Sequence, residues 1–409
     1  MLNRRHLLCC GAAAATGLFT SLSSPARASL RNACRTGLPP ALQDVVAAAF
    51  DGLDPQQLWD VHTHLLGTGD SGSGCTVNAQ LDQWWHPVEM LRKRFILNAA
   101  CVPTDTPSVD RAYVQRLRAL ADDFPEGARW LLFAFDHACD DAGRPVAANT
   151  TFHVPDAYAA AVADQHRARF AWVASIHPYR PDALARLDAA LAGGAVALKW
   201  LPSSMAIDLR DPRLRPFYDR LAATRLPVIV HCGEEKAVPG AGREDLGNPL
   251  HVRTALERGV RVIVAHCASL GHALDLDAPR PREVPAFSLF SRLMDEGWGD
   301  QLLGDISVVL QTNRHPDVAR TLLTRRDWHP RLLHGSDYPL PGIAATLRLP
   351  ALVRAGLLHE ADVAPLAALR DHNPLLFDLA VKRRVTWRGA AWTPTVFATR
   401  RHVERPAVS

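Results

Sequence analysis

The sequence predicts a single parallel (β/α)8 barrel, an α/β fold, with an insertion after its first strand and a helical C-terminal part. Strand-like and helix-like segments alternate along most of the 409 residues, which is typical of repeated βαβ units. Most of the strand-like segments are continuous apolar runs, as expected for strands that are buried on both faces. Several of them end in a histidine or an aspartate, and the C-terminal ends of the strands of such a barrel meet at one face.

We expect eight strands, the first at 58–61 and the last at 331–334. The full set is 58–61, 130–135, 171–176, 195–200, 227–230, 261–265, 303–308 and 331–334. Helical segments are expected between and after them, several opening with Pro and Asp at the helix start, at 156–169, 181–192, 213–223, 249–258, 316–324, 347–370 and 373–383. A helix near 40–52 precedes the barrel. The insertion at 75–129 holds another at 109–121, and the chain from 385 onwards reads as a loose tail with a short strand-like piece.

The first residues are typical of a twin-arginine signal peptide. Arg4-Arg5 precedes an apolar run that ends near Leu22, and Ala26-Arg27-Ala28 is a small-x-small cleavage site. The run is too short and too rich in Ala and Gly for a stable membrane span. We therefore expect a signal peptide at 1–28 and a periplasmic protein. The rest of the chain is expected to divide into a lead-in at 29–57, the barrel at 58–383 and a tail at 384–409.

Composition limits the classes of partner. The chain is 48% hydrophobic and 22% charged, as in soluble globular proteins. Without the leader it carries 43 basic and 42 acidic residues, so charge indicates neither a nucleic-acid-binding nor a membrane-binding surface. An exported protein can form disulfides, but the sequence does not give their pairing. Six cysteines lie beyond the leader, and none forms a C-x-x-C pair: Cys34, Cys75, Cys101, Cys139, Cys232 and Cys267.

The residues at the strand ends predict a metal site. His62 and His64 in Asp-Val-His-Thr-His are two apart, so in a strand their imidazoles point to the same side. His231 and His266 end two further strands, and Asp337 follows the last one. Each of these residues alone is more often a loop or capping residue. Together, three histidines and a carboxylate suit a divalent metal that keeps one position open for an activated water.

These motifs resemble those of the amidohydrolase superfamily, and within it the amidohydrolase-2 branch that includes aminocarboxymuconate-semialdehyde decarboxylase. The resemblance runs from about residue 58 to 383 and rests on Asp-Val-His-Thr-His at 60–64, Leu-Lys-Trp-Leu-Pro at 198–202, Val-Ile-Val-His-Cys-Gly at 228–233, Val-Ala-His-Cys at 264–267, His-Gly-Ser-Asp-Tyr-Pro at 334–339 and Asn-Pro-Leu-Leu-Phe at 373–377. It implies that the metal ligands are His62, His64, His231 and Asp337. It implies that His266 and Asp337 are the catalytic residues, with His266 orienting the water or polarising the substrate.

Three residues are candidates for substrate binding. Lys199 lies near the end of the fourth strand, His177 ends the third, and Arg314 follows the seventh, where it could hold a substrate carboxylate. His177 could equally have a structural role. In binuclear relatives a lysine on strand four is carboxylated and bridges two metals; we expect one metal per chain and an unmodified Lys199. Trp84-Trp85 could cover the site or simply pack.

The resemblance implies a metal-dependent hydrolase that uses metal-activated water on an amide, ester or lactone bond of a small-molecule substrate. Zn²⁺ is the expected metal, with Mn²⁺ or Fe²⁺ as alternatives. The alternative function is non-oxidative decarboxylation of an unsaturated or aromatic carboxylic acid on the same scaffold. A non-catalytic binding protein is the third interpretation. Whether the protein forms a homo-oligomer is left open.

Overall fold

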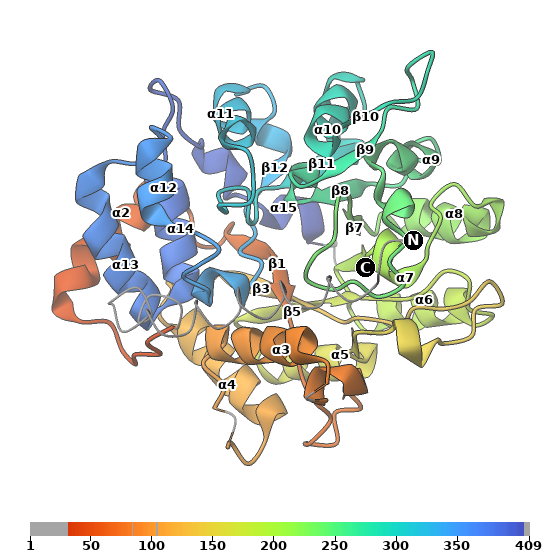
Figure 1. The fold of residues 1–409 in the computed structure, drawn as a ribbon, viewed down its shortest axis with the longest axis horizontal. Helices are drawn as coiled ribbons and strands as arrows, with labels where there is room; N and C mark the ends of the chain where they lie inside the picture. Colours follow the sequence, from red (N-terminus) through yellow and green to blue (C-terminus); the bar gives the residue numbers. More distant parts are fainter. Residues whose placement is uncertain (1–31, 84, 104, 405–409) are drawn as a thin grey trace, which may run out of the picture.

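The computed structural model describes residues 32–83, 85–103 and 105–404. The expected signal peptide at 1–28 and Trp84 lie outside the described residues. Eight strands form one sheet in which each strand is parallel to the next, and Figure 1 shows helices arranged around them. In sheet order the strands are β1 (Trp59–His64), β3 (Arg129–Phe133), β5 (Phe170–Ala174), β6 (Ala197–Trp200), β7 (Val228–His231), β8 (Val262–Ala265), β11 (Leu302–Asp305) and β12 (Leu332–Leu333).

The sheet closes into a barrel between its first and last strands. The N–H of Val61 donates to the carbonyl of His334 at 3.1 Å, and the N–H of His64 donates to the carbonyl of Tyr338 at 3.0 Å. The predicted (β/α)8 barrel is thus confirmed.

Helices cover the outer face of the strands. The chain between β3 and β12 supplies α5 (Asp156–Gln165), α6 (Ala183–Ala192), α7 (Pro202–Met205), α8 (Arg215–Thr224), α9 (Arg253–Leu256), α10 (Ala286–Asp295) and α11 (Pro316–Thr324). The expected helix at 249–258 forms only the short 3-10 turn η7 (Pro249–Val252) followed by α9. A two-stranded antiparallel hairpin, β9 (His272–Leu274) with β10 (Glu283–Pro285), stands between β8 and α10.

The barrel interior is filled by apolar side chains that alternate along the strands. One buried cluster lines the inside and includes Trp59, Val61, Leu131, Phe133, Val173, Ala197, Ile229, Ile263, Leu303 and Leu333. β1 contains a bulge, seen as a shift of its register with β3 between Asp60 and Thr63. His64 is paired with the inward-facing Phe133, so the bulge returns the end of β1 to the inner face.

The insertion after β1 forms a wall beside the barrel mouth. It comprises β2 (Thr76–Val77), η3 (Ala79–Asp82), α3 (Pro87–Ala99) and α4 (Val109–Asp122), and β2 pairs with β4 (Phe152–His153). A disulfide joins Cys34 to Cys101, immediately after α3, which supplies the pairing that the sequence left open. The hydroxyl of Tyr113 on α4 donates to the carbonyl of His64 at 2.6 Å and ties the insertion to the end of β1.

The C-terminal part is helical, as predicted, but the tail is not loose. The C-terminal helices are α12 (Leu349–Arg354), α13 (Val363–His372), α14 (Pro374–Arg384) and α15 (Arg400–Val403). The expected helix near the start of the chain is α2 (Gln43–Phe50). The expected helix at 347–370 is broken because Gly356 adopts a φ of +71° after α12. Residues 385–404 pack on the barrel through buried Trp392, Phe397 and Val403, and Val403 joins the interior cluster. The sequence missed this because these apolar residues are too widely spaced to show a period.

No helix among the described residues is long and apolar enough to cross a membrane.

Candidate metal centre

Three polar side chains occupy the last inward-facing position of their strands. Along each strand, residues two apart share a face. Each of these side chains therefore follows an interior apolar residue by two positions: Lys199 follows Ala197, His231 follows Ile229, and Asp305 follows Leu303. The barrel geometry brings these strand ends to one mouth, together with His62 and His64 of β1.

His62, His266 and Asp337 form the centre of the site. Their ligand atoms all lie within 4.8 Å of one another, and all three side chains are buried. Nε2 of His62 is 3.4 Å from Oδ1 of Asp337, and Nε2 of His266 is 3.9 Å from its Oδ2. Nε2 of the partly exposed His64 is 2.9 Å from Oδ1 of Asp337.

The contacts between the imidazole nitrogens and the side-chain oxygens of Asp337 do not have hydrogen-bond geometry. Among the described residues, no group donates a hydrogen bond to its buried Oδ1, although two imidazole nitrogens approach it. Lone-pair atoms that face one another without an intervening proton are what a set of metal ligands presents. The residues therefore fit a divalent metal: several imidazoles and one carboxylate are the donor set expected for Zn²⁺ or a related ion.

Three of the histidines are oriented through their other ring nitrogen. Nδ1 of His62 is 2.9 Å from Oδ2 of Asp305, Nδ1 of His266 is 2.8 Å from Oγ of Ser307, and Nδ1 of His231 is 3.2 Å from Oε2 of Glu235. An oxygen at Nδ1 fixes the tautomer that leaves Nε2 free to bind a metal. His231 thus has the orientation of a ligand, but its Nε2 lies 3.5 Å from the carbonyl of Glu234 and it does not belong to the tight group of three.

The backbone around two of these residues is left-handed. Asp337 has a φ of 59°, and His266, Cys267 and Ala268 have φ values of 55°, 51° and 49°. Such values are unfavourable for residues with a Cβ and persist where the surroundings fix them. Here the N–H of Asp337 donates to the carbonyl of His62 at 2.7 Å, and the N–H of His266 donates to Oδ1 of Asp305 at 3.1 Å.

Burial keeps the imidazoles neutral. It lowers the pKa of His62 well below the usual range, and the cation of Lys199 adds to this effect. Burial likewise lowers the pKa of His266 well below the usual range, and it lowers the pKa of His231. A histidine must be neutral to bind a metal, so the folded protein presents the imidazoles in the required form.

The site opens into a cavity of about 240 Å³ at the barrel mouth. Its walls combine the histidines and Asp337 with apolar side chains from several loops, namely Leu66, Ile96, Phe152, Leu201, Val238, Leu270 and Leu340. Ile96 belongs to α3, so the insertion supplies part of the wall.

Two cations line this cavity without a carboxylate partner among the described residues. Lys199 is 1% exposed, its Nζ has no hydrogen-bond partner, and it lies 5.0 Å from the ring centre of Phe133. Burial lowers the pKa of Lys199 to about 8, against the opposing effect of Asp305 and Asp337. Arg314 has only neutral partners, and its best contact is to Oδ1 of Asn313 at 2.7 Å.

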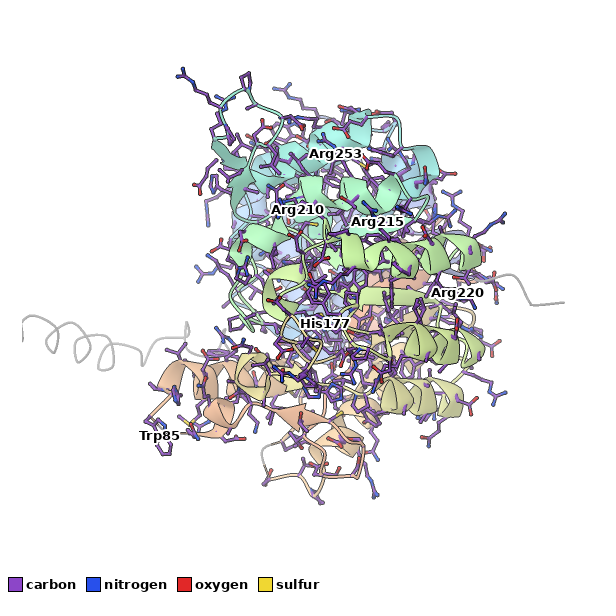
Figure 2. All side chains as sticks on the ribbon, turned by 90° about the vertical axis from the view of Figure 1, so that its right-hand side faces the viewer. Trp85, His177, Arg210, Arg215, Arg220 and Arg253 are labelled. Atoms are coloured by element: carbon purple, nitrogen blue, oxygen red, sulfur yellow. A yellow bond between two sulfur atoms is a disulfide. The ribbon has the colours of Figure 1, made fainter. Side chains whose placement is uncertain are left out.

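Two sequence candidates lie away from the cavity. His177 is fully buried, with Nε2 2.8 Å from the carbonyl of Met205, and Nδ1 accepts from the N–H of Tyr179 at 3.3 Å. It therefore does not line the site, because both ring nitrogens are used in the packing beside α7. Trp85 is 58% exposed and lies at the outer edge of the molecule in Figure 2, so it does not cover the cavity in this conformation.

The sequence interpretation gave no role to Asp305 or Ser307. Asp305 ends the seventh strand and contacts Nδ1 of His62, whereas Ser307 follows that strand and contacts Nδ1 of His266. The signal that could have found Asp305 is its spacing of two from Leu303, which makes it the last inward residue of that strand. Ser307 has no comparable signal, because it lies in the irregular turn after the strand.

The chain matches a family model and is similar to several solved structures. A family model described as Amidohydrolase matches residues 59–377. No curated protein matches the chain. Among solved structures, the chain is similar to an uncharacterised TIM-barrel protein from Bordetella bronchiseptica, with 18% identity, 73% of this chain and 100% of that chain covered, and a TM-score of 0.44.

Two further solved structures are similar to the chain. One is 4-oxalomesaconate hydratase from Rhodopseudomonas palustris, with 13% identity, 85% of this chain and 96% of that chain covered, and a TM-score of 0.41. The other is 5-carboxyvanillate decarboxylase from Sphingomonas paucimobilis, with 14% identity, 77% and 98% covered, and a TM-score of 0.37.

Proposed function

Because the chain belongs to the amidohydrolase family, whose members are metal-dependent, we propose that it is a metal-dependent hydrolase of amide, ester or lactone bonds. The observation that carries this proposal is the convergence of His62, His266 and Asp337 on one point without hydrogen bonds to Oδ1 of Asp337. Zn²⁺ is the metal that this donor set favours, and one ion per chain is proposed.

His62 and Asp337 are proposed as ligands because they belong both to the resemblance and to the close group of three. His64 is proposed as a third ligand from the resemblance and from its Nε2, which lies 2.9 Å from Oδ1 of Asp337. The fourth ligand is His231 if the family pattern holds, and His266 then faces the substrate. The close group that His266 forms with His62 and Asp337, to which His231 does not belong, favours the reverse assignment. Metal analysis of His231→Ala beside His266→Ala separates the two, since only the true ligand lowers the metal affinity.

A bound divalent metal would lower the pKa of a coordinated water and polarise a substrate carbonyl. Asp337 is the group placed to take a proton from that water, because it is the carboxylate at the centre of the site. The apolar walls exclude bulk water and so strengthen these electrostatic interactions. Asp305 and Ser307 hold the imidazoles in place while charge is redistributed.

The substrate is proposed to carry an anionic group. Lys199 and Arg314 both line the cavity and lack a carboxylate partner among the described residues, so each is a partly or fully desolvated cation without compensation. A carboxylate on the substrate would supply the missing partner, and Arg314 can bind it with two hydrogen bonds.

A decarboxylase is the second candidate. The same two cations and the apolar wall around them would also suit an aromatic or unsaturated acid that loses CO₂. In a decarboxylase the anionic group is the reacting group, whereas in a hydrolase it is a handle away from the scissile bond.

The two candidates are separated by assay of the purified, metal-loaded protein. One panel holds lactones, esters and amides that carry a carboxylate, and the other holds aromatic and unsaturated acids. Metal-dependent hydrolysis in the first panel, abolished in Asp337→Asn, is the expected result. Release of CO₂ from the second panel without hydrolysis in the first would favour the decarboxylase. Absence of both activities in metal-loaded protein would contradict the proposal.

A further inference from the structure

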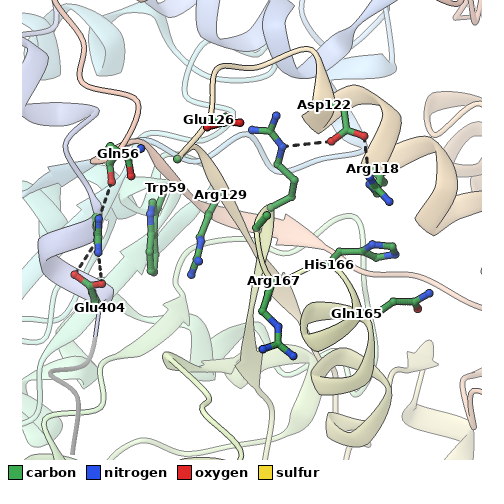
Figure 3. A pocket seen from close by; sticks show the side chains of 14 residues that line it. Gln56, Trp59, Arg118, Asp122, Glu126, Arg129, Gln165, His166, Arg167 and Glu404 are labelled. Carbon is green, nitrogen blue, oxygen red and sulfur yellow. Dashed lines mark hydrogen bonds and ion pairs between the residues drawn. The ribbon is translucent and has the colours of Figure 1, made fainter.

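A second cavity, of about 720 Å³, lies at the opposite end of the barrel from the metal centre. Three of its lining residues lie at the starts of strands rather than at their ends. Trp59 is the first residue of β1, Arg129 is the first residue of β3, and Arg169 immediately precedes β5. Figure 3 shows the side chains that line it.

This cavity is rich in arginine. Five guanidinium groups line it against three carboxylates: Arg118, Arg129, Arg167, Arg169 and Arg400 against Asp122, Glu126 and Glu404. Four of the five arginines have a carboxylate partner. Arg118 and Arg169 share Asp122, Arg400 pairs with Glu404, and Arg167 pairs with Asp164 outside the cavity.

Arg129 is the exception. Among the described residues its guanidinium has no hydrogen bond and no carboxylate within 4.0 Å, although the residue is partly buried. Its guanidinium carbon lies 5.1 Å from the ring centre of Trp59, and that of Arg400 lies 5.6 Å from the same ring. Burial lowers the pKa of Arg129 and the like charge of Arg400 lowers it further, whereas the carboxylate of Glu404 opposes both effects without cancelling them.

A partly buried cation beside a second cation is costly, and Glu404, which pairs with Arg400, offsets only part of this cost. The stacking on Trp59 offsets part of this cost and holds the guanidinium plane in position. Its five N–H donors remain available in the fork that fits two oxygens of one ligand group. Glu126 also lines the cavity and has no cationic partner among the described residues, so it would compete with an incoming anion.

We propose that this cavity is a binding site for a small oxyanion, a phosphate or carboxylate group, which Arg129 holds against Trp59 at the N-terminal end of the barrel. The ligand is not the substrate of the metal centre, since the two cavities share no lining residue. The oxyanion site is therefore separate from the site at which catalysis is proposed.

Titration calorimetry on the metal-loaded protein tests the proposal with inorganic phosphate in one arm and succinate in the other, which distinguishes the two classes of oxyanion. Arg129→Gln keeps most of the side-chain stem over Trp59 but removes the charge, and should weaken binding of the preferred anion at least about tenfold. Glu126→Gln should strengthen it a few-fold. Arg220→Gln removes one exposed arginine on α8 that pairs with Asp188, and should leave binding unchanged.

Arg314→Gln controls for anions that bind at the metal centre instead. The proposal expects the component lost in Arg129→Gln to survive in Arg314→Gln, while enzymatic activity is unchanged in Arg129→Gln. Binding of both anions that is equal in wild type and Arg129→Gln would overturn the proposal. So would the absence of binding at millimolar anion, or loss of all binding in Arg314→Gln alone.

Discussion

The carboxylate of Asp305, which was not singled out from the sequence, connects two histidines of the candidate metal centre. It accepts from Nδ1 of His62 and from the N–H groups of His266 and Ser307. A group that orients a ligand from behind affects metal affinity without touching the metal.

We predict that Asp305→Asn lowers metal affinity roughly 10–100-fold, because the amide orients His62 less strongly than the carboxylate does. Competition with a chelator measures the affinity. Asp317→Asn on α11 is the control, since Asp317 is exposed and, within the described part of the chain, forms ion pairs only with Arg320 and His315. Unchanged affinity in Asp305→Asn would contradict the role of Asp305.

Lys199 is predicted to serve the substrate rather than the metal. Lys199→Met keeps the buried volume and removes the charge, so KM for an anionic substrate should rise at least about tenfold while metal content is unchanged. Lys236→Met is the control, because Lys236 lies exposed at the cavity rim and pairs with Glu234. Loss of metal in Lys199→Met, together with two metal equivalents in wild type, would instead indicate a carboxylated bridging lysine.

The sequence identified most of the residues at the centre of the site, because strand-end histidines and aspartates converge in any parallel barrel. His62, His64, His231, His266, Lys199, Arg314 and Asp337 all line one cavity. It could not exclude His177, which also follows a strand, because only the structure shows that both of its ring nitrogens are used in packing beside α7. The ligand assignments among the histidines stay predictions.

At the scale of elements, the disulfide fixes the insertion that supplies a cavity wall. It joins Cys34 of the lead-in to Cys101 just after α3, and Ile96 of α3 lines the cavity. The N–H of Asn32 donates to Oδ1 of Asn98 at 3.0 Å and strengthens the same junction.

Removing this disulfide should destabilise the protein by about 2–4 kcal/mol, because the reduced unfolded chain gains conformational freedom. Urea unfolding of Cys34→Ser, Cys101→Ser and the double variant measures the effect. All three should lose the same free energy, since either change breaks the same bond. A double variant that loses clearly more than each single variant would show that the cysteines act separately.

The start of α5 should make stability depend on pH. Burial raises the pKa of Asp156 to about 7 from its usual 3.8, although its carboxylate accepts from the N–H of Ser175 at 2.9 Å. The folded state then holds the proton more tightly than the unfolded chain, so the free energy of unfolding falls as pH rises from about 4 to about 7.

Asp156→Asn cannot titrate, so its stability relative to wild type should grow between pH 4 and pH 8 by on the order of 2–4 kcal/mol. Denaturant unfolding at both pH values checks this. Asp164→Asn on the same helix is the control, because Asp164 is an exposed carboxylate that pairs with Arg167. Parallel pH profiles of wild type and Asp156→Asn would contradict the prediction.

The strands were predictable because their apolar runs are continuous, whereas irregular elements were not. The bulge in β1 leaves no trace in the alternation of residue types. Residues 385–404 read as a tail because their buried aromatics contact the barrel from scattered positions. A local sequence pattern indicates periodic burial. The contacts of the bulge and of residues 385–404 are not periodic, because the tertiary structure alone sets them.

At the scale of the whole molecule, the polar candidate site and the apolar core lie at different levels of the barrel. Polar side chains at the strand ends surround the metal centre, while the interior cluster below them is apolar and is closed by Val403. The chemistry is thus separated from the core that stabilises the fold. The disulfide agrees with the predicted export to an oxidising compartment, which stays a prediction.

Metal content measured by elemental analysis tests the central claim most directly. Wild type, His62→Ala, Asp337→Ala and the double variant are compared after purification in the same metal-supplemented buffer, with circular dichroism as the control for folding. The account predicts about one equivalent per chain in wild type and almost none in the double variant, with unchanged secondary structure, because the ligands lie above the apolar core. A folded double variant that keeps one equivalent of metal would contradict it.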